Sequence, residues 1–269
     1  MFYLFSIISQ LWIISIYSFL LTLKGHSTAL IDKKLYFIGG DNSSSFFYHD
    51  LTRNHKIFFS IYGDDINDLT GPLVGIRWAT SCVGDLNNDS IFVFGGDNWY
   101  GSLDSYRSKP YYVMNKLINK FDTTSQEWSV PEIEGEPIRR RNLQAVIDTK
   151  GNMYMFGGFR LFVNFTFFKD MVIFNTKTYK YSNGSTIDGP PSKYAYTATL
   201  LPTGIIIYIG GLVYDAKITF NPINNVSFIN LYYSVYSSVI ISVYFFFNQI
   251  TMYDINEDSW NYAVNYLIS

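Results

Sequence analysis

Four short apolar runs recur along this chain, and each of them ends in a pair of glycines. The first glycines of the pairs lie 56, 62 and 53 residues apart. The runs are continuously apolar, which is expected of strands that are covered on both faces. A glycine pair suits a backbone that turns sharply or closely approaches another backbone. The runs are KLYFIGG, IFVFGG, MYMFGG and IIIYIGG, with the pairs Gly39 and Gly40, Gly95 and Gly96, Gly157 and Gly158, and Gly210 and Gly211.

A second mark recurs in phase with the glycines in the last three units. An aromatic residue is followed by Asp or Asn, and a second aromatic residue stands seven positions after the first. The polar side chain can hydrogen-bond to its own turn, and the closing ring offers a large area for packing between units. A basic residue, Arg77, Arg141 or Lys193, also precedes each of the last three glycine pairs by 16 to 18 positions. The aromatic marks are Phe121, Asp122 and Trp128; Phe174, Asn175 and Tyr181; and Tyr253, Asp254 and Trp260.

This repeat predicts the fold. A period of this length, with four short strands in each unit, is typical of the blades of a β-propeller. We therefore predict an all-β protein of about four blades, each with four antiparallel strands, covering residues 28–70, 71–130, 131–188 and 189–269. The glycines and the aromatic marks have structural roles in this interpretation.

The same residues resemble the kelch repeat, in which a hydrophobic run and a double glycine are followed by an aromatic–Asp pair and a tryptophan. The segments RRRNLQAVIDTKGNMYMFGG and PPSKYAYTATLLPTGIIIYIGG are similar to extracellular kelch and galactose-oxidase-like propellers of some fungi. The first unit departs from the pattern, because FFYHDLTRNHKIFF has neither the adjacent aromatic–Asp pair nor a tryptophan. Kelch propellers usually close with six or seven blades. The chain is therefore a short ring, an open arc that pairs with another chain, or a truncated product.

Composition and charge narrow the class of protein. Aromatic residues make up 19% of the chain and charged residues only 16%, which favours strands and turns over helices. The formal net charge of −2 provides no field that would attract nucleic acid. Cys82 is the only cysteine, so an intramolecular disulfide is impossible, and we expect its thiol to be buried in the core.

The first 23 residues contain no charged side chain. We interpret residues 1–27 as a signal peptide, with an uncleaved signal anchor as the alternative. Either one predicts a secreted or surface-displayed protein. Five sequons, at Asn42, Asn88, Asn164, Asn183 and Asn225, are candidate N-glycosylation sites in such a protein.

The fourth unit carries an apolar insert at about residues 220–248 that the other units lack. A membrane span over residues 226–247, an additional strand segment, and sequence foreign to the domain such as a translated intron are the three interpretations. The last is favoured, because removing the insert restores the spacing of the repeat.

The resemblance raises the question of an oxidase, because galactose oxidase shares this propeller and binds copper. The chain has only His26, His49 and His55, and nothing around Cys82 matches the cysteine motif of that family. We therefore predict no catalytic residue, no metal site and no cofactor, and we favour a binding protein over an enzyme.

Other polar clusters also have a simpler structural interpretation. Asp64, Asp65 and Asp68 form an acidic loop that is expected to be solvated. The segment with Asp85, Asn87 and Asp89 half resembles a calcium loop, but a β-turn is favoured. The basic run 139–141 is expected to form hydrogen bonds where a blade begins.

The favoured function is a binding scaffold that recognises a protein or a glycan through loops at one end of the blades. The long segment GGDNWYGSLDSYRSKPYYV is the candidate ligand loop, because aromatic residues and arginine are enriched at contact surfaces. Its candidate contact residues are Trp99, Tyr100, Tyr106 and Arg107. A galactose-oxidase-like enzyme and a truncated, non-functional family member are the alternatives.

Overall fold

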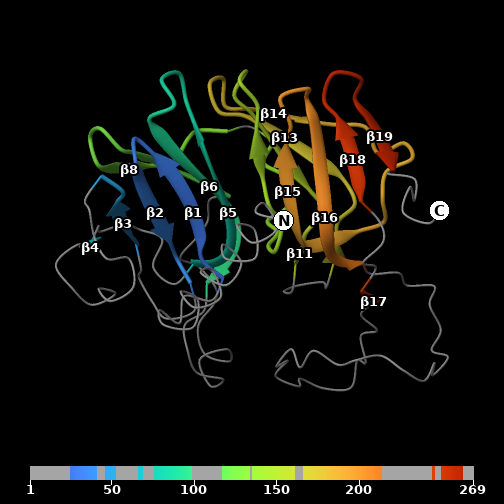
Figure 1. The fold of residues 1–269 in the computed structure, drawn as a ribbon, viewed down its shortest axis with the longest axis horizontal. Coiled ribbons are helices and arrows are strands. Elements are labelled where there is room, and N and C mark those ends of the chain that lie inside the picture. Colours follow the sequence, from blue (N-terminus) through green and yellow to red (C-terminus); the bar gives the residue numbers. More distant parts are fainter. Residues whose placement is uncertain are drawn as a thin grey trace, which may run out of the picture.

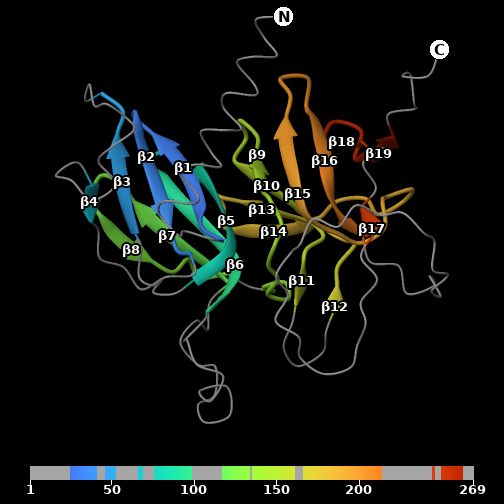
Figure 2. The same ribbon diagram turned by 60° about the horizontal axis from the view of Figure 1, so that its bottom comes forward.

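A computed structural model describes residues 25–40, 46–52, 66–68, 76–98, 117–133, 135–160, 166–213, 244–245 and 250–262. These residues contain strands and turns and no helix, so none of them forms a helix able to cross a membrane. Four antiparallel sheets are arranged as the blades of a four-blade β-propeller, as the repeat predicts (Figures 1 and 2).

Each blade contains four main strands in chain order from the inside outward. Blade 1 contains β1 (Ser27–Ile31), β2 (Lys34–Ile38), β3 (Phe46–Asp50) and β4 (Ile66–Asp68). Blade 2 contains β5 (Ile76–Gly84), β6 (Ser90–Asn98), β7 (Ile118–Asp122) and β8 (Glu127–Ser129). Blade 3 contains β9 (Val146–Ile147), β10 (Asn152–Phe156), β13 (Met171–Asn175) and β14 (Lys180–Asn183). Blade 4 contains β15 (Lys193–Leu200), β16 (Ile205–Val213), β18 (Thr251–Asp254) and β19 (Ser259–Tyr262).

Three further short strands lie beside these blades. β11 (Phe159–Arg160) pairs with β12 (Thr166–Phe167) below blade 3, and β17 (Tyr244–Phe245) pairs with the end of β16. β17 is the described part of the predicted insert at 220–248, and the rest of that insert lies outside the described residues.

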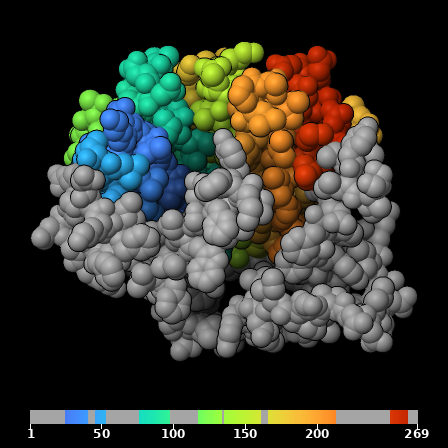
Figure 3. Space-filling view, viewed as in Figure 1, coloured from blue at the N-terminus to red at the C-terminus, as the bar shows by residue number. Residues whose placement is uncertain are grey.

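The strands alternate in direction, so each blade has two distinct ends. At the turn end, short turns join β1 to β2, β5 to β6 and β15 to β16 (top of Figure 1). At the diglycine end, the second strand of each blade finishes and the next blade begins. Consecutive inner strands contact each other: β1 contacts β5, β5 contacts β9, and β9 contacts β15. On the face seen in Figure 3, the differently coloured segments of the chain pack side by side.

The aromatic marks occupy equivalent places in blades 2, 3 and 4. In each blade the two aromatic residues are cross-strand partners, with ring centroids 5.1 Å apart for Phe121 and Trp128, and 5.0 Å for Tyr253 and Trp260. The closing ring also reaches the preceding blade, because Trp260 lies 4.6 Å from Phe156. The repeated phrase therefore marks one structural position, as the sequence predicted.

The residue after the first aromatic stabilises its turn. The Oδ1 atom of Asp122 accepts hydrogen bonds from the backbone amides of Thr124 and Ser125, at 2.8 and 2.9 Å. Asn175 and Asp254 play the same role in the next two blades. Blade 1 lacks the aromatic–Asp pair, as the sequence indicates, but it has a counterpart of the aspartate: Asp50 accepts a hydrogen bond from the amide of Thr52 at 2.9 Å. It was missed because His49 stands where the other blades have an aromatic ring.

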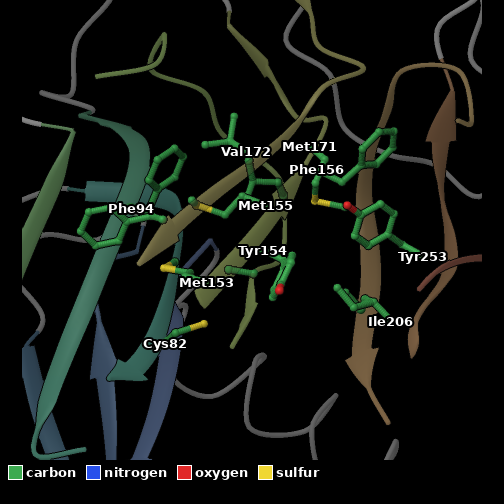
Figure 4. Close-up of a cluster of buried hydrophobic side chains, with 14 of the residues drawn as sticks. Cys82, Phe94, Met153, Tyr154, Met155, Phe156, Met171, Val172, Ile206 and Tyr253 are labelled. Atoms are coloured by element: carbon green, nitrogen blue, oxygen red, sulfur yellow. The ribbon is translucent and has the colours of Figure 1, made fainter. Parts of the chain in front are cut away.

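The core lies between the blades. In β10, Met153 and Met155 point toward blade 2, whereas Tyr154 and Phe156 point toward blade 4 (Figure 4). All four side chains are at most 6% exposed, which explains why the run is apolar without alternation. Cys82 belongs to the same cluster, and burial raises the pKa of its thiol to about 12.

The glycine pairs join each blade to the next. The amide of the second glycine donates to a carbonyl oxygen at the start of the next blade: Gly40 to Ile76 at 2.7 Å, Gly96 to Arg140 at 3.0 Å, and Gly158 to Lys193 at 2.9 Å. The first glycine has no room for a side chain, because a Cβ atom would lie 2.0 to 2.3 Å from the same oxygen at Gly39, Gly95 and Gly157. Both glycines also have positive φ angles, so the backbone conformation favours glycine in addition to the lack of space for a side chain.

The acidic turn between β5 and β6 is held by an ion pair. Asp85 pairs with Lys120 of β7, and Asn87 donates to Asp89 at 3.4 Å. Burial favours a raised pKa for Asp85, but the hydrogen bonds from Lys120 Nζ and the Leu86 amide outweigh it and lower the pKa below its ordinary value. Asp85 is thus engaged within the protein, in agreement with the β-turn interpretation.

Substitution of the docking glycine tests the role of the diglycine pair. We expect Gly157→Ala to lower the free energy of unfolding by at least about 3 kcal/mol, because it combines left-handed strain with displacement of an inter-blade hydrogen bond. Gly135→Ala is the control, since Gly135 has a φ of +72° and an added Cβ atom would meet no described atom within 4 Å. Its cost should be about 1 kcal/mol. Equal losses in urea denaturation would contradict the docking role.

The Asp85 ion pair gives a pH-dependent prediction. Because the pKa of Asp85 is lower in the folded state, its stabilising effect is present above the unfolded pKa and disappears as the pH falls through the folded pKa. We expect Asp85→Asn to lower Tm at pH 7, with the difference from wild type shrinking below about pH 4. Glu257→Gln, at an exposed turn, serves as the control. A difference in Tm that is independent of pH would argue against the ion pair.

Candidate functional site

The segments that begin the four blades line one cavity of about 440 Å³ on the propeller axis. This axial cavity is lined by residues 25–28 of blade 1, 78–81 of blade 2, 142–145 at the start of blade 3, and 195–196 of blade 4. A cavity of this size accommodates a side chain or a short segment of a partner, and it is too small for a folded domain.

One residue near the start of each blade has a left-handed backbone at the cavity. These residues are Gly25, Trp78, Asn142 and Ala195, with φ angles of 79°, 59°, 58° and 53°. Successive members are linked by backbone hydrogen bonds: the amide of Trp78 donates to the Gly25 carbonyl at 2.7 Å, Asn142 to Trp78 at 3.0 Å, and Ala195 to Asn142 at 2.7 Å. Non-glycine residues in this region are strained and persist only where surrounding contacts hold them, which these bonds do.

The wall of the axial cavity is polar and largely uncharged. Thr80 Oγ1 accepts a hydrogen bond from the Ala145 amide at 2.9 Å, and Gln144 Oε1 accepts one from the Ala198 amide at 3.0 Å, so both side chains join neighbouring blades. In contrast, Ser27 Oγ and Asn142 Oδ1 are buried without a hydrogen-bond partner among the described residues. The polar wall offered to a ligand therefore consists of the other polar residues that line the cavity, including Thr28 and Ser81.

Tyr196 closes one side of the axial cavity. Its hydroxyl donates to the carbonyl oxygen of Phe156 in blade 3, and its ring lies 5.2 Å from that of Tyr208. Burial raises the pKa of the Tyr196 hydroxyl well above its ordinary value, so the group remains a neutral donor. The residue therefore acts as a rigid part of the wall.

Two arginines and one aspartate adjoin the cavity at the diglycine end, and we call them the rim triad. Asp97 accepts from Arg77 Nε at 3.2 Å and pairs with Arg141, whose guanidinium lies 4.8 Å from the ring of Phe159. The arginine side chains are 15% exposed and that of Asp97 is 9% exposed. With two cations and one anion, the triad carries a net positive charge next to the axial cavity.

The other two residues of the basic run 139–141, Arg139 and Arg140, form hydrogen bonds where blade 3 begins. Arg139 donates to the carbonyl oxygen of Gly95 at 2.7 Å. Arg140 is 3% exposed and binds Asp170 through two nitrogens, at 2.6 and 3.1 Å, while its guanidinium lies 3.9 Å from the Phe168 ring. These arginines form the hydrogen bonds at the start of a blade that the sequence suggested.

Lys193 of blade 4 is the counterpart of Arg140 in blade 3, because each accepts the amide of a second glycine of the preceding blade. It is 4% exposed, and burial lowers the pKa of its ammonium group. Its carbonyl oxygen docks on the glycine pair of blade 3, so its place is fixed by the inter-blade contact.

Several residues singled out in the sequence lie outside the described residues. They include the candidate ligand-loop residues Trp99, Tyr100, Tyr106 and Arg107, and also His55, Asp64 and Asp65. His26 lines the axial cavity and its ring lies 5.8 Å from Phe37, whereas His49 lies in β3, so the structure does not bring these two together in one described site. Among the described residues, no group of three His, Cys, Asp or Glu side chains is placed to hold a metal ion.

Sequence reasoning missed the cavity residues. Trp78, Asn142 and Ala195 share no side-chain chemistry; what they share is a place in the repeat, 17, 15 and 15 residues before a first glycine. Gly25 and His26, which the sequence interpretation assigned to the signal peptide, contribute to the same cavity. The equivalent position of these residues in each repeat was the one signal in the sequence that could have identified them. The basic residues Arg77 and Arg141, which directly precede Trp78 and Asn142, mark that position.

Comparisons with known proteins agree with this architecture. Residues 25–265 match the KLHDC2/KLHL20/DRC7 Kelch-repeats domain. Human Kelch domain-containing protein 1 is 27% identical over 218 residues, covering 72% of this chain and 50% of the relative, so the chain spans about half the length of that protein.

Among solved structures, the one titled "Structure of YjhT" has a TM-score of 0.56 at 12% identity, covering 92% of this chain and 67% of that chain. This likeness supports the fold alone. Together with the diglycine docking and the in-register aromatic pairs, the match over residues 25–265 shows that this chain belongs to the Kelch-repeat domain family.

Proposed function

We propose that this chain is a protein-binding scaffold whose ligand contacts lie at the diglycine end, with one segment of the partner entering the axial cavity. The observation that carries this proposal is that the segments at the start of all four blades line one polar cavity. Kelch propellers commonly bind proteins, and a cavity with polar lining residues such as Thr28 and Ser81 suits specific hydrogen bonds to such a ligand.

The two ends of the propeller differ in the surface they offer. At the turn end, the described connections are short and hold themselves with local hydrogen bonds, as at Asp122 and Asp254. At the diglycine end lies the rim triad, where Arg77 and Arg141 supply hydrogen-bond donors. Arginine is enriched at contact surfaces, which favours this end.

Blocking the axial cavity tests the proposal. Ser81 lines the cavity, so Ser81→Trp should fill it, whereas Ser182→Trp places the same change on the exposed outer strand β14. A random peptide library displayed on phage is selected against the wild-type protein, and the enriched peptides are measured against both variants. We expect Ser81→Trp to weaken binding at least tenfold, about 1.4 kcal/mol, and Ser182→Trp to leave it unchanged.

Three results would contradict this function. Equal binding by both variants would place the contacts elsewhere, and failure to enrich any peptide would argue against a protein ligand. Enrichment on a glycan array in the absence of peptide binding would instead support glycan recognition.

We also propose that the protein is exported and N-glycosylated. Support comes from the uncharged residues 1–23 and from two sequon asparagines, Asn88 and Asn183, that are exposed in the structure. A cleaved leader compatible with the axial cavity would end before Gly25, because the Gly25 carbonyl accepts the Trp78 amide.

Expression in a eukaryotic secretory host tests export. We expect secreted protein that loses mass on endoglycosidase treatment, with a smaller loss in the Asn88→Gln and Asn183→Gln variants than in wild type. Retention of the whole product inside the cell without glycan would contradict export.

A further inference from the structure

Blade 4 has a glycine pair at the position that docks a following blade, but nothing occupies it among the described residues. Gly210 and Gly211 have φ angles of +70° and +88°, as the other pairs have. A Cβ atom at Gly210 would meet no described atom within 4 Å, whereas at Gly39, Gly95 and Gly157 it would lie 2.0 to 2.3 Å from the carbonyl oxygen of the next blade. The docking geometry is therefore present in blade 4 without its carbonyl.

The residue before the glycine pair is also exposed, which shows that the described part of the chain does not cover this face. Ile209 is 53% exposed, whereas its equivalents Ile38, Phe94 and Phe156 are each 1% exposed. Those three are buried because the following blade packs on them. An aliphatic side chain at this position gains free energy only when a neighbour covers it.

The inner strand of blade 4 also lacks the contacts that the other inner strands make with a following blade. Thr197 is the counterpart of Thr80 and Gln144, whose side-chain oxygens accept an amide of the next blade, and Thr197 is exposed. The chain of backbone hydrogen bonds around the axis also stops here, because no such bond joins Ala195 to Gly25 among the described residues. We call this surface, formed by Ala195, Thr197, Ile209, Gly210 and Gly211, the forward face of blade 4.

Blade 1 has the complementary exposed surface, which we call its rear face. Leu30 is 56% exposed, and Leu35 and Phe37 are half-buried. In the other blades the equivalents of Leu35 and Phe37 are buried against the preceding blade; Ile91 and Val93, for example, are 0% exposed. None of the residues named on the two faces carries a charge, so bringing them together desolvates no ionic group among them.

We infer that the two faces join between two copies of this chain, the forward face of blade 4 of each copy receiving the rear face of blade 1 of the other. Each contact repeats the inter-blade packing that the chain already forms three times, and Gly25 of the second copy supplies an amide for the Ala195 carbonyl. The contact is head-to-tail, so the assembly closes as a dimer when it is made twice, once in each direction, whereas a contact made in one direction only would extend into a series of larger assemblies.

Sedimentation velocity of the full chain tests this assembly. The wild type should sediment as a dimer, with twice the monomer mass of 31.0 kDa. Ile209→Asp should be monomeric, because it places a charge in the joined faces, and it should fold normally since Ile209 is exposed within one chain. Leu86→Asp is the matched control at the turn end, where Leu86 is 73% exposed, and it should remain dimeric.

A second variant tests whether the rear face of blade 1 is what occupies the forward face of blade 4. Leu30→Asp should also be monomeric, and mixing it with Ile209→Asp should restore association, because one unaltered contact remains between the two variants. A wild-type monomer, a series of assemblies larger than the dimer, loss of the dimer in Leu86→Asp, or failure of the mixed variants to associate would each overturn the inference.

Discussion

The fold depends on one contact, the docking of a backbone carbonyl at the start of each blade onto the glycine pair of the blade before it. The carbonyl oxygens of Ile76, Arg140 and Lys193 fill the space that a side chain would need at the first glycine and accept a hydrogen bond from the second. Two backbones can approach this closely only where no Cβ intervenes. The contact therefore fixes the distance and register between neighbouring sheets, and the apolar side chains fill the remaining space.

The candidate site follows from the same contact. Because every blade begins at the diglycine end, its first residues lie next to the axis, where the left-handed positions at Trp78, Asn142 and Ala195 line the axial cavity. The two arginines of the rim triad directly precede two of these residues, since Arg77 precedes Trp78 and Arg141 precedes Asn142. The contact between blades and the proposed ligand-binding surface thus lie at the same end of the propeller, whereas the described connections at the turn end are short.

The fold could be predicted from the sequence because the residues that recur in each unit are the ones that form the contacts within and between blades. The spacing of the glycine pairs and the seven-residue aromatic pairing correspond to docking and to cross-strand partners such as Phe121 and Trp128. The site was harder to predict, because its members share a backbone conformation rather than a side-chain type, as Gly25, Trp78 and Ala195 illustrate. Asp50 was missed for a related reason, since His49 replaced the aromatic residue that marked the equivalent position elsewhere.

Hydrogen exchange at the second glycines tests the central claim most directly. If a carbonyl of the next blade holds each of these amides, the amides of Gly40, Gly96 and Gly158 exchange only when blades separate, at rates close to those of the core strands β6 and β10. Exchange of these three amides as fast as that of exposed amides in the turns at the other end would show that the blades are not joined in this way.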